Sequence, residues 1–333
     1  MNAAPRPLKI LGSAAVTPRG SISSEAIDRR FGLSAGTTFA RTGIKQRPVC
    51  SEETQVELAV RAASLALRDA GLSPNDIRTL IFASAVGYQS IPSTGPLVQK
   101  ALGVPDGVCA SFDLNSTCLS FLTALDVAGH LVQTDPKANC LIVSAELPSR
   151  GLSWEHDAKT ASMFGDGAAA VVVGGHPGTS YLIAGHMETY PSASELCRLE
   201  SGGTRHDAHK NAEAFLANSW FKMEAQALFR HSAAFFPGFL DRLLSKAGWS
   251  REDVDVVVPH QASKAALHHL AKRCGFPKSK IIDIIQDHGN QVAASIPTAL
   301  DFARRSGRMI EGSRVLLLGT SAGVSFGGVA LVV

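Results

Sequence analysis

The sequence has few charged and aromatic residues. Only 18% of its 333 residues are Asp, Glu, Lys or Arg and 6% are Phe, Trp or Tyr, whereas 45% are hydrophobic. Disordered chains have the opposite balance, so this composition excludes disorder and is typical of an Ala-, Val- and Gly-rich α/β enzyme. The net charge of +3 is too small to indicate a nucleic-acid partner.

The sequence also lacks long hydrophobic runs and metal-binding cysteine motifs. Its longest apolar runs, such as residues 168–173, fall far below the roughly 18–20 residues that a membrane span needs. The N-terminus has no apolar core of a secretory signal. Neither C-x-x-C nor zinc spacing is found among Cys50, Cys109, Cys118, Cys140, Cys197 and Cys274. We therefore expect a cytoplasmic protein with free thiols, no metal site and no membrane contact.

The chain contains an internal repeat. Residues 67–84 (LRDAGLSPNDIRTLIFAS) and 244–261 (LSKAGWSREDVDVVVPHQ) share a helix end, Ala-Gly and a buried-type strand at an offset of 177. The tetrapeptide TALD ends at Asp126 and again at Asp301, at an offset of 175. Continuous Val, Ile and Leu strands that alternate with helices are typical of sheets covered on both faces. A duplicated α/β unit is the prediction.

A third pair of similar segments supports the duplication, because FGDGAAAVVV at 164–173 resembles FGGVALVV at 326–333. We predict two halves, residues 1–175 and 176–333, packed as layers of helix and sheet, with a site at their junction. The segment 176–215 is irregular and rich in Gly, Ser and His. It either shapes an entrance to the site or is a mobile surface insertion.

Cys118 is the best candidate for a nucleophile. Asn115 and Ser116 are good N-cap residues, and the apolar spacing after them predicts a buried helix. A cysteine in the first turn would feel the positive end of the helix dipole, which favours the thiolate. The alternative is a small buried hydrophobic residue, which is our interpretation of the other five cysteines.

His260 and Asn290 are candidates for a second part of the same site. His260 follows a predicted strand in VVVPHQAS, and Asn290 precedes a predicted helix in DHGNQVAASIP. Taken singly, they are a structural histidine and an ordinary N-cap asparagine. In the repeat, however, Asn290 precedes the counterpart of the Cys118 helix and His260 follows the matching strand. We therefore expect a thiol nucleophile and two nitrogen donors to meet in one cavity.

These residues give the chain a resemblance to the β-ketoacyl-ACP synthase III family, condensing enzymes of the thiolase superfamily. The resemblance is carried by RTGI (41–44), DLNSTC (113–118), FGDGAAA (164–170), VPHQAS (258–263) and GNQVAASIP (289–297). It implies a thiolase-like α/β fold with five αβαβα layers, built from two pseudo-duplicated halves. It also implies a homodimer.

The resemblance further implies a mechanism. Cys118 would take an acyl group from acyl-CoA or acyl carrier protein as a thioester, and a malonyl thioester would then lose CO2 and attack it. His260 and Asn290 would bind the extender carbonyl, and the backbone amides of Cys118 and Ala322 would form the oxyanion hole. CoA and phosphopantetheine thioesters are substrates here, so no cofactor is implied.

Further positions match substrate-binding and docking residues of the family. The expected substrate contacts are Arg41, Leu147, Phe164, Arg150 and Ile91, of which Ile91 would cross the dimer interface into the partner's acyl pocket. A basic patch for the acidic carrier protein would comprise Arg230, Lys264, Lys272 and Arg273, or these residues are simply a solvated helix face. Arg150 either reads a carboxylate on a dicarboxyl acyl donor or pairs with Glu155 or Asp157.

The sequence departs from the family pattern at three places. Thr37 stands where a tryptophan usually stacks on the CoA adenine, and GTSAGVSFGG (319–328) replaces a nearly continuous glycine run. Leu119, Ser120 and Phe121 replace Ser-Gly-Phe, and we expect the larger side chains to reshape the acyl tunnel. These departures favour a specialised paralogue over the enzyme that starts fatty-acid synthesis.

Three other functions compete with decarboxylative condensation. Non-decarboxylative condensation of two acyl-CoAs needs a glutamate base, and residues 83–95 contain no acidic residue. Acyl transfer to an oxygen or nitrogen acceptor is disfavoured because both His260 and Asn290 are retained. A catalytically silent partner subunit is disfavoured by the intact Cys, His and Asn set.

Overall fold

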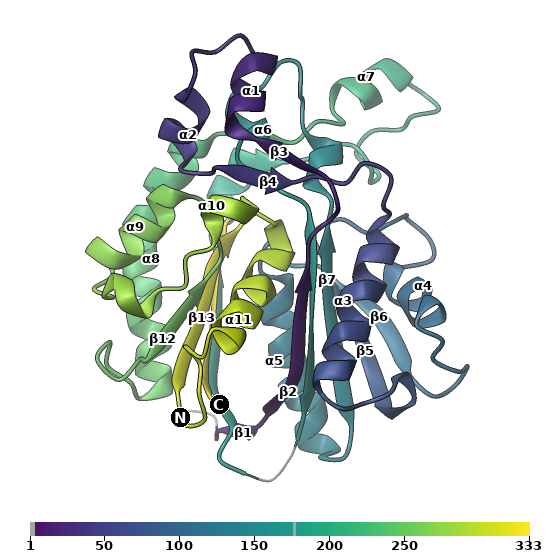
Figure 1. Cartoon of the computed structure of the whole chain (residues 1–333), viewed down its shortest axis with the longest axis vertical. Helices are drawn as coiled ribbons and strands as arrows, with labels where there is room; N and C mark the ends of the chain where they lie inside the picture. Colours follow the sequence, from purple (N-terminus) through teal and green to yellow (C-terminus); the bar gives the residue numbers. More distant parts are fainter. Residues whose placement is uncertain (1–3, 176–177) are drawn as a thin grey trace.

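The computed structural model describes residues 4–175 and 178–333 and contains two five-stranded sheets (Figure 1). The first sheet has the order β2-β8-β7-β5-β6, with β2 (Lys9–Val16), β5 (Ile77–Ala83), β6 (Ala110–Leu114), β7 (Asn139–Glu146) and β8 (Gly167–Gly174). The second has the order β1-β9-β14-β13-β12, with β1 (Arg6–Pro7), β9 (Tyr181–Thr189), β12 (Val256–Pro259), β13 (Arg314–Ser321) and β14 (Ser325–Val332).

The repeat in the sequence is a repeat in the structure. In the first sheet β5 and β7 are parallel and β7 and β8 antiparallel, and β12, β13 and β14 pair in the same way in the second. The repeated segment leads from α3 (Gln55–Asp69) to β5 and from α8 (Ala225–Ala247) to β12. The two TALD segments lie in α5 (Ser120–Thr134) and α11 (Ser295–Arg305).

The sheets and the long helices form five layers. Figure 1 shows α3 and α4 (Thr94–Ala101) outside the first sheet, α8 and α9 (Lys264–Lys272) outside the second, and α5 and α11 between the sheets. One buried apolar cluster joins α5 and α11 to both sheets, and two further clusters join each sheet to its outer helices. The expected five-layered αβαβα fold is confirmed.

Shorter elements surround these layers. Two ribbons pair β3 (Ser21–Ser23) with β4 (Gln46–Pro48) and β10 (Cys197–Arg198) with β11 (Lys222–Met223). The short α-helices are α1 (Ser24–Arg30), α2 (Thr37–Thr42), α6 (Ala158–Ala161), α7 (Ala212–Ala217) and α10 (Ile285–His288). Short 3-10 helices cover Pro74–Asp76, Pro148–Gly151, Pro191–Leu196, Lys278–Lys280 and Val292–Ala294. No helix in the described ranges combines the length and the apolar character needed to cross a bilayer.

Local sequence explains why the helices begin and which faces they bury. In α3, Thr54 and Glu57 form a capping box, in which each side chain accepts a hydrogen bond from the backbone amide of the other. The buried face of α3 is a stripe of Leu58, Ala59, Ala62, Ala63, Ala66 and Leu67. The small alanines let this helix pack closely on the first sheet.

The repeated TALD aspartates tie each central helix to the sheet of the other half. Asp126 of α5 forms an ion pair with Arg6 of β1, which belongs to the second sheet. Asp301 of α11 accepts hydrogen bonds from the Ser13 hydroxyl at 2.7 Å and the Ala15 amide at 3.2 Å, both on β2 of the first sheet. The two halves are therefore interlocked through their middle layer.

The edges of the two sheets differ. Polar side chains occupy the outer edge of β2, because Asp69 accepts from the Ser13 amide at 2.9 Å and Arg305 donates to the Ser13 carbonyl at 2.8 Å. In the second sheet β1 is two residues long and β12 is wholly buried. Strand β6 instead lies at an edge with Ala110 and Phe112 exposed.

Candidate active site

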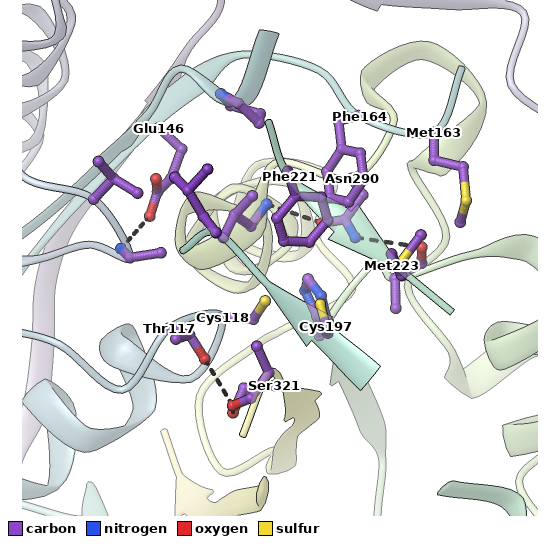
Figure 2. A pocket seen from close by; sticks show the side chains of 18 of the residues that line it. Thr117, Cys118, Glu146, Met163, Phe164, Cys197, Phe221, Met223, Asn290 and Ser321 are labelled. Atoms are coloured by element: carbon purple, nitrogen blue, oxygen red, sulfur yellow. Dashed lines mark hydrogen bonds between the residues drawn. The ribbon is translucent and has the colours of Figure 1, made fainter. Parts of the chain in front are cut away.

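A cavity of about 980 Å³ lies at the junction of the two halves. Cys118, His260 and Asn290 all line it, so the structure brings together the three residues that the repeat predicted to meet. Figure 2 labels Cys118 and Asn290. This volume is at the upper end of the usual range for a small-molecule site. Part of the wall comes from Cys197, Leu199 and neighbouring residues, so the irregular segment shapes the cavity rather than being only a surface insertion.

Cys118 sits on a tight turn that precedes α5. Thr117 has a φ of 51°, a value that side-chain-bearing residues rarely adopt, and this stops the helix from extending back to Ser116. The turn is held by the Thr117 amide, which donates to Asn115 Oδ1 at 2.8 Å, and by the Ser116 amide, which donates to Ser120 Oγ at 2.9 Å. Helix α5 therefore begins at Ser120, and the nucleophile lies just outside its first turn.

The helix dipole does not dominate the electrostatics of Cys118. The surrounding protein displaces water from the thiol and raises its pKa above the usual value, and Cys197 and Glu146 raise it further. Hydrogen bonds from the backbone amides of Ala322 and of Cys118 itself act in the opposite direction and lower the pKa. We expected the helix dipole to favour the thiolate, but the effect of burial is larger. The resting group is therefore a thiol.

His260 lies directly after β12 and is only 5% exposed. Its backbone amide donates to the Leu318 carbonyl on β13 at 2.8 Å. Gly319 makes this approach possible, because a Cβ there would lie 2.7 Å from the His260 Cβ. Burial lowers the pKa of His260 to about 4, so the imidazole is neutral at pH 7 and carries one N–H donor.

Asn290 lies in the turn between α10 and the 3-10 turn before α11. Its Oδ1 accepts a hydrogen bond from the Val292 amide at 2.9 Å, and its Nδ2 lies 3.4 Å from the Ala262 carbonyl that it faces. The FGDG segment supports this turn, because Gly165 has no Cβ and the His288 carbonyl packs against its backbone. The amide group of Asn290 thus reaches the cavity from the second half of the chain.

Ala322 lies in the turn between β13 and β14, opposite the Cys118 turn. The Thr117 hydroxyl donates to its carbonyl at 3.3 Å, which joins the two turns. The amides of Ala322 and Cys118 both act on the Cys118 sulfur. Paired amides beside a nucleophile suit an oxyanion that forms when the nucleophile attacks a thioester.

The predicted substrate residues are placed at different distances from this centre. Leu147 and Phe164 line the cavity, and Phe164 stacks edge-on against Phe221 with ring centroids 5.3 Å apart. Ile91 does not line the cavity of its own chain; it is 87% exposed on the loop after β5. Arg41 lies on α2 outside the cavity lining and donates to the Ala158 carbonyl and the Ser162 hydroxyl.

Arg150 lies in the 3-10 turn after β7 and contributes to the cavity wall. Its guanidinium donates to the Glu53 carbonyl at 3.0 Å. Pairing with Glu155 or Asp157 was the alternative, but Asp157 accepts from the Thr160 amide and the only ion-pair contact among described residues for Glu155 is with a histidine. The predicted pairing of Arg150 with Glu155 or Asp157 is therefore wrong.

The four predicted docking residues lie on or beside two neighbouring helices. Arg230 is on α8, and Lys264, Lys272 and Arg273 are on or at the end of α9; all four are exposed. The ring of Phe229 on α8 meets that of His269 on α9 at 6.0 Å, and both residues line the cavity. The basic residues therefore flank one side of the cavity.

Glu146 and Cys197 are among the cavity residues that the sequence did not predict. Glu146, at the end of β7, is 3% exposed, and its Oε1 accepts a hydrogen bond from the Ala85 amide at 2.6 Å. Burial raises its pKa to about 8. The sequence feature that could have indicated Glu146 is its position as an acidic residue at the end of the apolar segment CLIVSAE. Cys197, in the irregular segment, gave no such signal.

One predicted effect of the departures from the family pattern is wrong. Leu119 and Ser120 are fully buried and do not line the cavity. Leu119 instead packs against Gly319 and Gly327 of the second sheet, which leave room for its larger side chain. The acyl-binding space is therefore not reshaped by this substitution.

The fold and the cavity are those of condensing acyltransferases with a thiolase-like architecture. The family model described as 3-oxoacyl-(acyl-carrier-protein) synthase III matches residues 112–191, and that of its C-terminal part matches residues 244–333. A β-ketoacyl-(acyl-carrier-protein) synthase III of Rhizorhabdus wittichii is 34% identical over 97% of this chain and 98% of its own. The chain belongs to the 3-oxoacyl-(acyl-carrier-protein) synthase III family.

Solved structures agree with this assignment. The 3-oxoacyl-(acyl-carrier-protein) synthase III of Aquifex aeolicus is 33% identical, with a TM-score of 0.88 over 98% of this chain and all of its own. The priming β-ketosynthase from the R1128 polyketide biosynthetic pathway is 26% identical, with a TM-score of 0.89 over 99% of this chain and 97% of its own. The solved structures that this chain resembles therefore include a 3-oxoacyl-(acyl-carrier-protein) synthase III and a priming ketosynthase of polyketide biosynthesis.

Proposed function

We propose that this protein joins an acyl group to a malonyl-type extender by decarboxylative condensation. The observation that carries the proposal is the meeting of Cys118, His260 and Asn290 on the wall of one cavity. The acyl donor is an acyl-CoA or an acyl carrier protein, of which the names of the relatives mention the carrier protein. No cofactor is needed, because both substrates are activated thioesters.

The first half-reaction transfers the acyl group to Cys118. The sulfur attacks the thioester carbonyl, a new S–C bond forms, and the bond to the leaving thiol breaks. Negative charge develops on the carbonyl oxygen, where the amides of Cys118 and Ala322 stabilise it. The proton of the Cys118 thiol passes to the leaving thiolate, so the step is neutral overall.

The second half-reaction forms the carbon–carbon bond. When the extender loses CO2, charge moves onto its thioester carbonyl oxygen, and the resulting enolate attacks the acyl carbonyl on Cys118. The C–C bond forms, the bond between the acyl carbon and the Cys118 sulfur breaks, and the released thiolate takes a proton from water to regenerate the thiol. The neutral imidazole of His260 and the amide of Asn290 donate hydrogen bonds to that oxygen. Removing one such donor commonly lowers the rate by about 10²–10³.

Intact-mass measurement separates the two steps. Incubation with acyl-CoAs adds an acyl mass to the wild-type protein and none to Cys118→Ala, while Cys140→Ser, a buried cysteine outside the cavity, is acylated normally. His260→Ala accepts the acyl group but forms no β-ketoacyl product with a malonyl carrier. If Cys118 gains no acyl mass from CoA or carrier donors, the proposal is wrong.

Glu146 favours one alternative reaction. Non-decarboxylative condensation of two acyl-CoAs needs a base, and this carboxyl lines the cavity although residues 83–95 contain none. Burial raises its pKa to about 8, so most of it is protonated at pH 7 and only the deprotonated fraction can accept a proton. Product formation from two acyl-CoAs without a malonyl donor, lost in Glu146→Gln, would establish this reaction instead.

We also propose that the protein is a homodimer joined through β6. Exposed apolar side chains gather on this strand and the loop after β5, namely Val86, Tyr88, Ile91 and Phe112. An open strand edge with apolar neighbours favours pairing with a second copy, which would carry Ile91 toward the partner's cavity. Sedimentation should show a dimer that Phe112→Asp dissociates; a monomeric wild-type protein would refute the assembly.

The basic residues beside the cavity are proposed to receive the acidic carrier protein. Among the described residues, no ion pair involves Arg230, Lys264, Lys272 or Arg273. Lys272→Glu should weaken the reaction with carrier-bound substrate, in a salt-dependent way, without affecting acyl-CoA loading. Equal effects on both donors would remove the docking role.

Six free cysteines suit a reducing compartment, so we place the protein in the cytoplasm.

A further inference from the structure

The cavity contains a second thiol beside the nucleophile. Cys118 enters from the turn before α5 and Cys197 from β10, and Figure 2 shows the two sulfur-bearing side chains next to each other. After burial, Cys197 is the largest influence that raises the pKa of Cys118. Because electrostatic influence falls with distance, this coupling marks the two thiols as neighbours.

Cys197 has no part in the condensation chemistry derived above. The half-reactions use the sulfur of Cys118, the donors of His260 and Asn290 and two backbone amides. The other four cysteines do not line the cavity. The second cavity thiol is therefore specific to this site and available for a different reaction.

The two sulfurs have different surroundings. Two backbone amides, from Ala322 and Cys118, donate toward the Cys118 sulfur, whereas burial alone acts on Cys197 and raises its pKa to about 12. Burial raises the pKa of both thiols, so the amides do not make Cys118 the more acidic one; they are instead placed to donate hydrogen bonds to an oxygen attached to its sulfur. In a pair of thiols this makes Cys118 the sulfur that is oxidised first and Cys197 the one that resolves it.

We propose that Cys118 and Cys197 form a redox pair that a hydroperoxide converts into a disulfide, which reversibly switches off acyl loading. The Cys118 thiol loses its proton and its sulfur attacks the peroxide; the O–O bond breaks, sulfur is oxidised to a sulfenic acid, and the leaving oxygen takes up the proton, so the peroxide is reduced to an alcohol or water. Cys197 then attacks that sulfur: the S–S bond forms, the S–O bond breaks, and water leaves with the proton of Cys197. A dithiol reductant returns both thiols and is itself oxidised.

The disulfide has two consequences for the enzyme. It occupies the sulfur that must accept the acyl group, so the oxidised protein cannot be loaded. It also consumes the sulfenic acid before a second peroxide can oxidise it irreversibly. The loss of acyl loading on oxidation rests on the proposed function, whereas formation of the disulfide does not.

The test uses the full-length protein and hydrogen peroxide, without substrate. Wild-type protein should lose two hydrogen atoms in intact mass, and peptide mapping should find Cys118 linked to Cys197. Cys140→Ser, which changes a buried cysteine outside the cavity, should behave like wild type. Cys197→Ser and Cys197→Ala should form no such link and should instead gain oxygen atoms at Cys118.

Recovery of acyl loading distinguishes protection from simple damage. After peroxide and then dithiothreitol, the wild-type protein should regain its loading, whereas both Cys197 variants should remain inactive. Oxidation should be faster at higher pH, because the thiolate is the reacting form. Absence of the Cys118–Cys197 peptide, or equal recovery in the Cys197 variants, overturns the proposal. Loading of the reduced wild-type protein tests the proposed function separately.

Discussion

Gly319→Ala tests whether the close packing behind His260 determines its catalytic position. A Cβ at residue 319 would lie 2.7 Å from the His260 Cβ, 3.2 Å from Leu119 Cδ2 and 3.5 Å from Ile296 Cδ1. The two leucine and isoleucine contacts are ends of flexible side chains and can move. The His260 Cβ has no such freedom and can move only together with its backbone, whose amide is hydrogen-bonded to the Leu318 carbonyl at 2.8 Å. The imidazole must therefore shift.

The size of the shift sets the expected effect. Restoring an ordinary carbon–carbon contact needs a displacement of about 1 Å. Overpacking of this kind costs about 1–3 kcal/mol of unfolding free energy. A catalytic group displaced by about 1 Å can lower the rate about 10²-fold, which corresponds to about 2.7 kcal/mol in the activation barrier. We expect condensation to fall by this factor while acyl loading of Cys118 falls much less.

A neighbouring glycine supplies the control. Gly328→Ala would place a Cβ 2.3 Å from Leu243 Cδ2 of α8, on the outer side of the second sheet, so it should cost stability without moving His260. Loading is measured by intact mass, condensation by product formation with a malonyl carrier, and stability by urea unfolding. The reasoning fails if both variants lose condensation in proportion to stability, or if Gly319→Ala condenses at the wild-type rate.

Three further substitutions give independent tests. Asp301→Ala removes the hydrogen bond to buried Ser13 and should lower the unfolding free energy by about 1–3 kcal/mol, whereas exposed Asp106→Ala should leave it unchanged in urea unfolding. Because the pKa of Glu146 is raised, the folded chain holds a proton that the unfolded chain releases, and the free energy of unfolding should fall as pH rises from about 4.5 to about 8. Glu146→Gln should reduce that pH dependence, and an unchanged pH dependence would refute the raised pKa of Glu146. Arg150→Ala should reduce loading from ω-carboxyacyl thioesters about 10- to 100-fold without changing loading from simple acyl thioesters, and equal use of both donors by both proteins excludes carboxylate recognition.

The meeting of Cys118, His260 and Asn290 could be predicted because it depends on the repeat. The series α3-β5-α5-β7-β8 of the first half returns in the same order as α8-β12-α11-β13-β14 in the second, so residues at matching places approach one another where the halves join. The layers were predictable for a related reason: continuous apolar strands can be buried only when helices cover both faces of the sheet.

Other parts of the site depend on contacts between distant segments. Nothing local marks Thr117 as a residue with positive φ, so the start of α5 was predicted too early. The space for Leu119 comes from Gly319 and Gly327, which are about two hundred residues away in the sequence. Cys197 reaches the cavity only because β10 pairs with β11, an association that the irregular segment did not indicate.

The unequal edges of the two sheets limit how large an assembly can become. In the ranges that the structure describes, ion pairs and hydrogen bonds block β2, β1 is only two residues long, and β12 is covered. Strand β6 remains open, and pairing with the same strand of a second copy uses that edge completely. If two copies pair through β6 as proposed, growth by edge-to-edge pairing stops at two chains and no fibre forms.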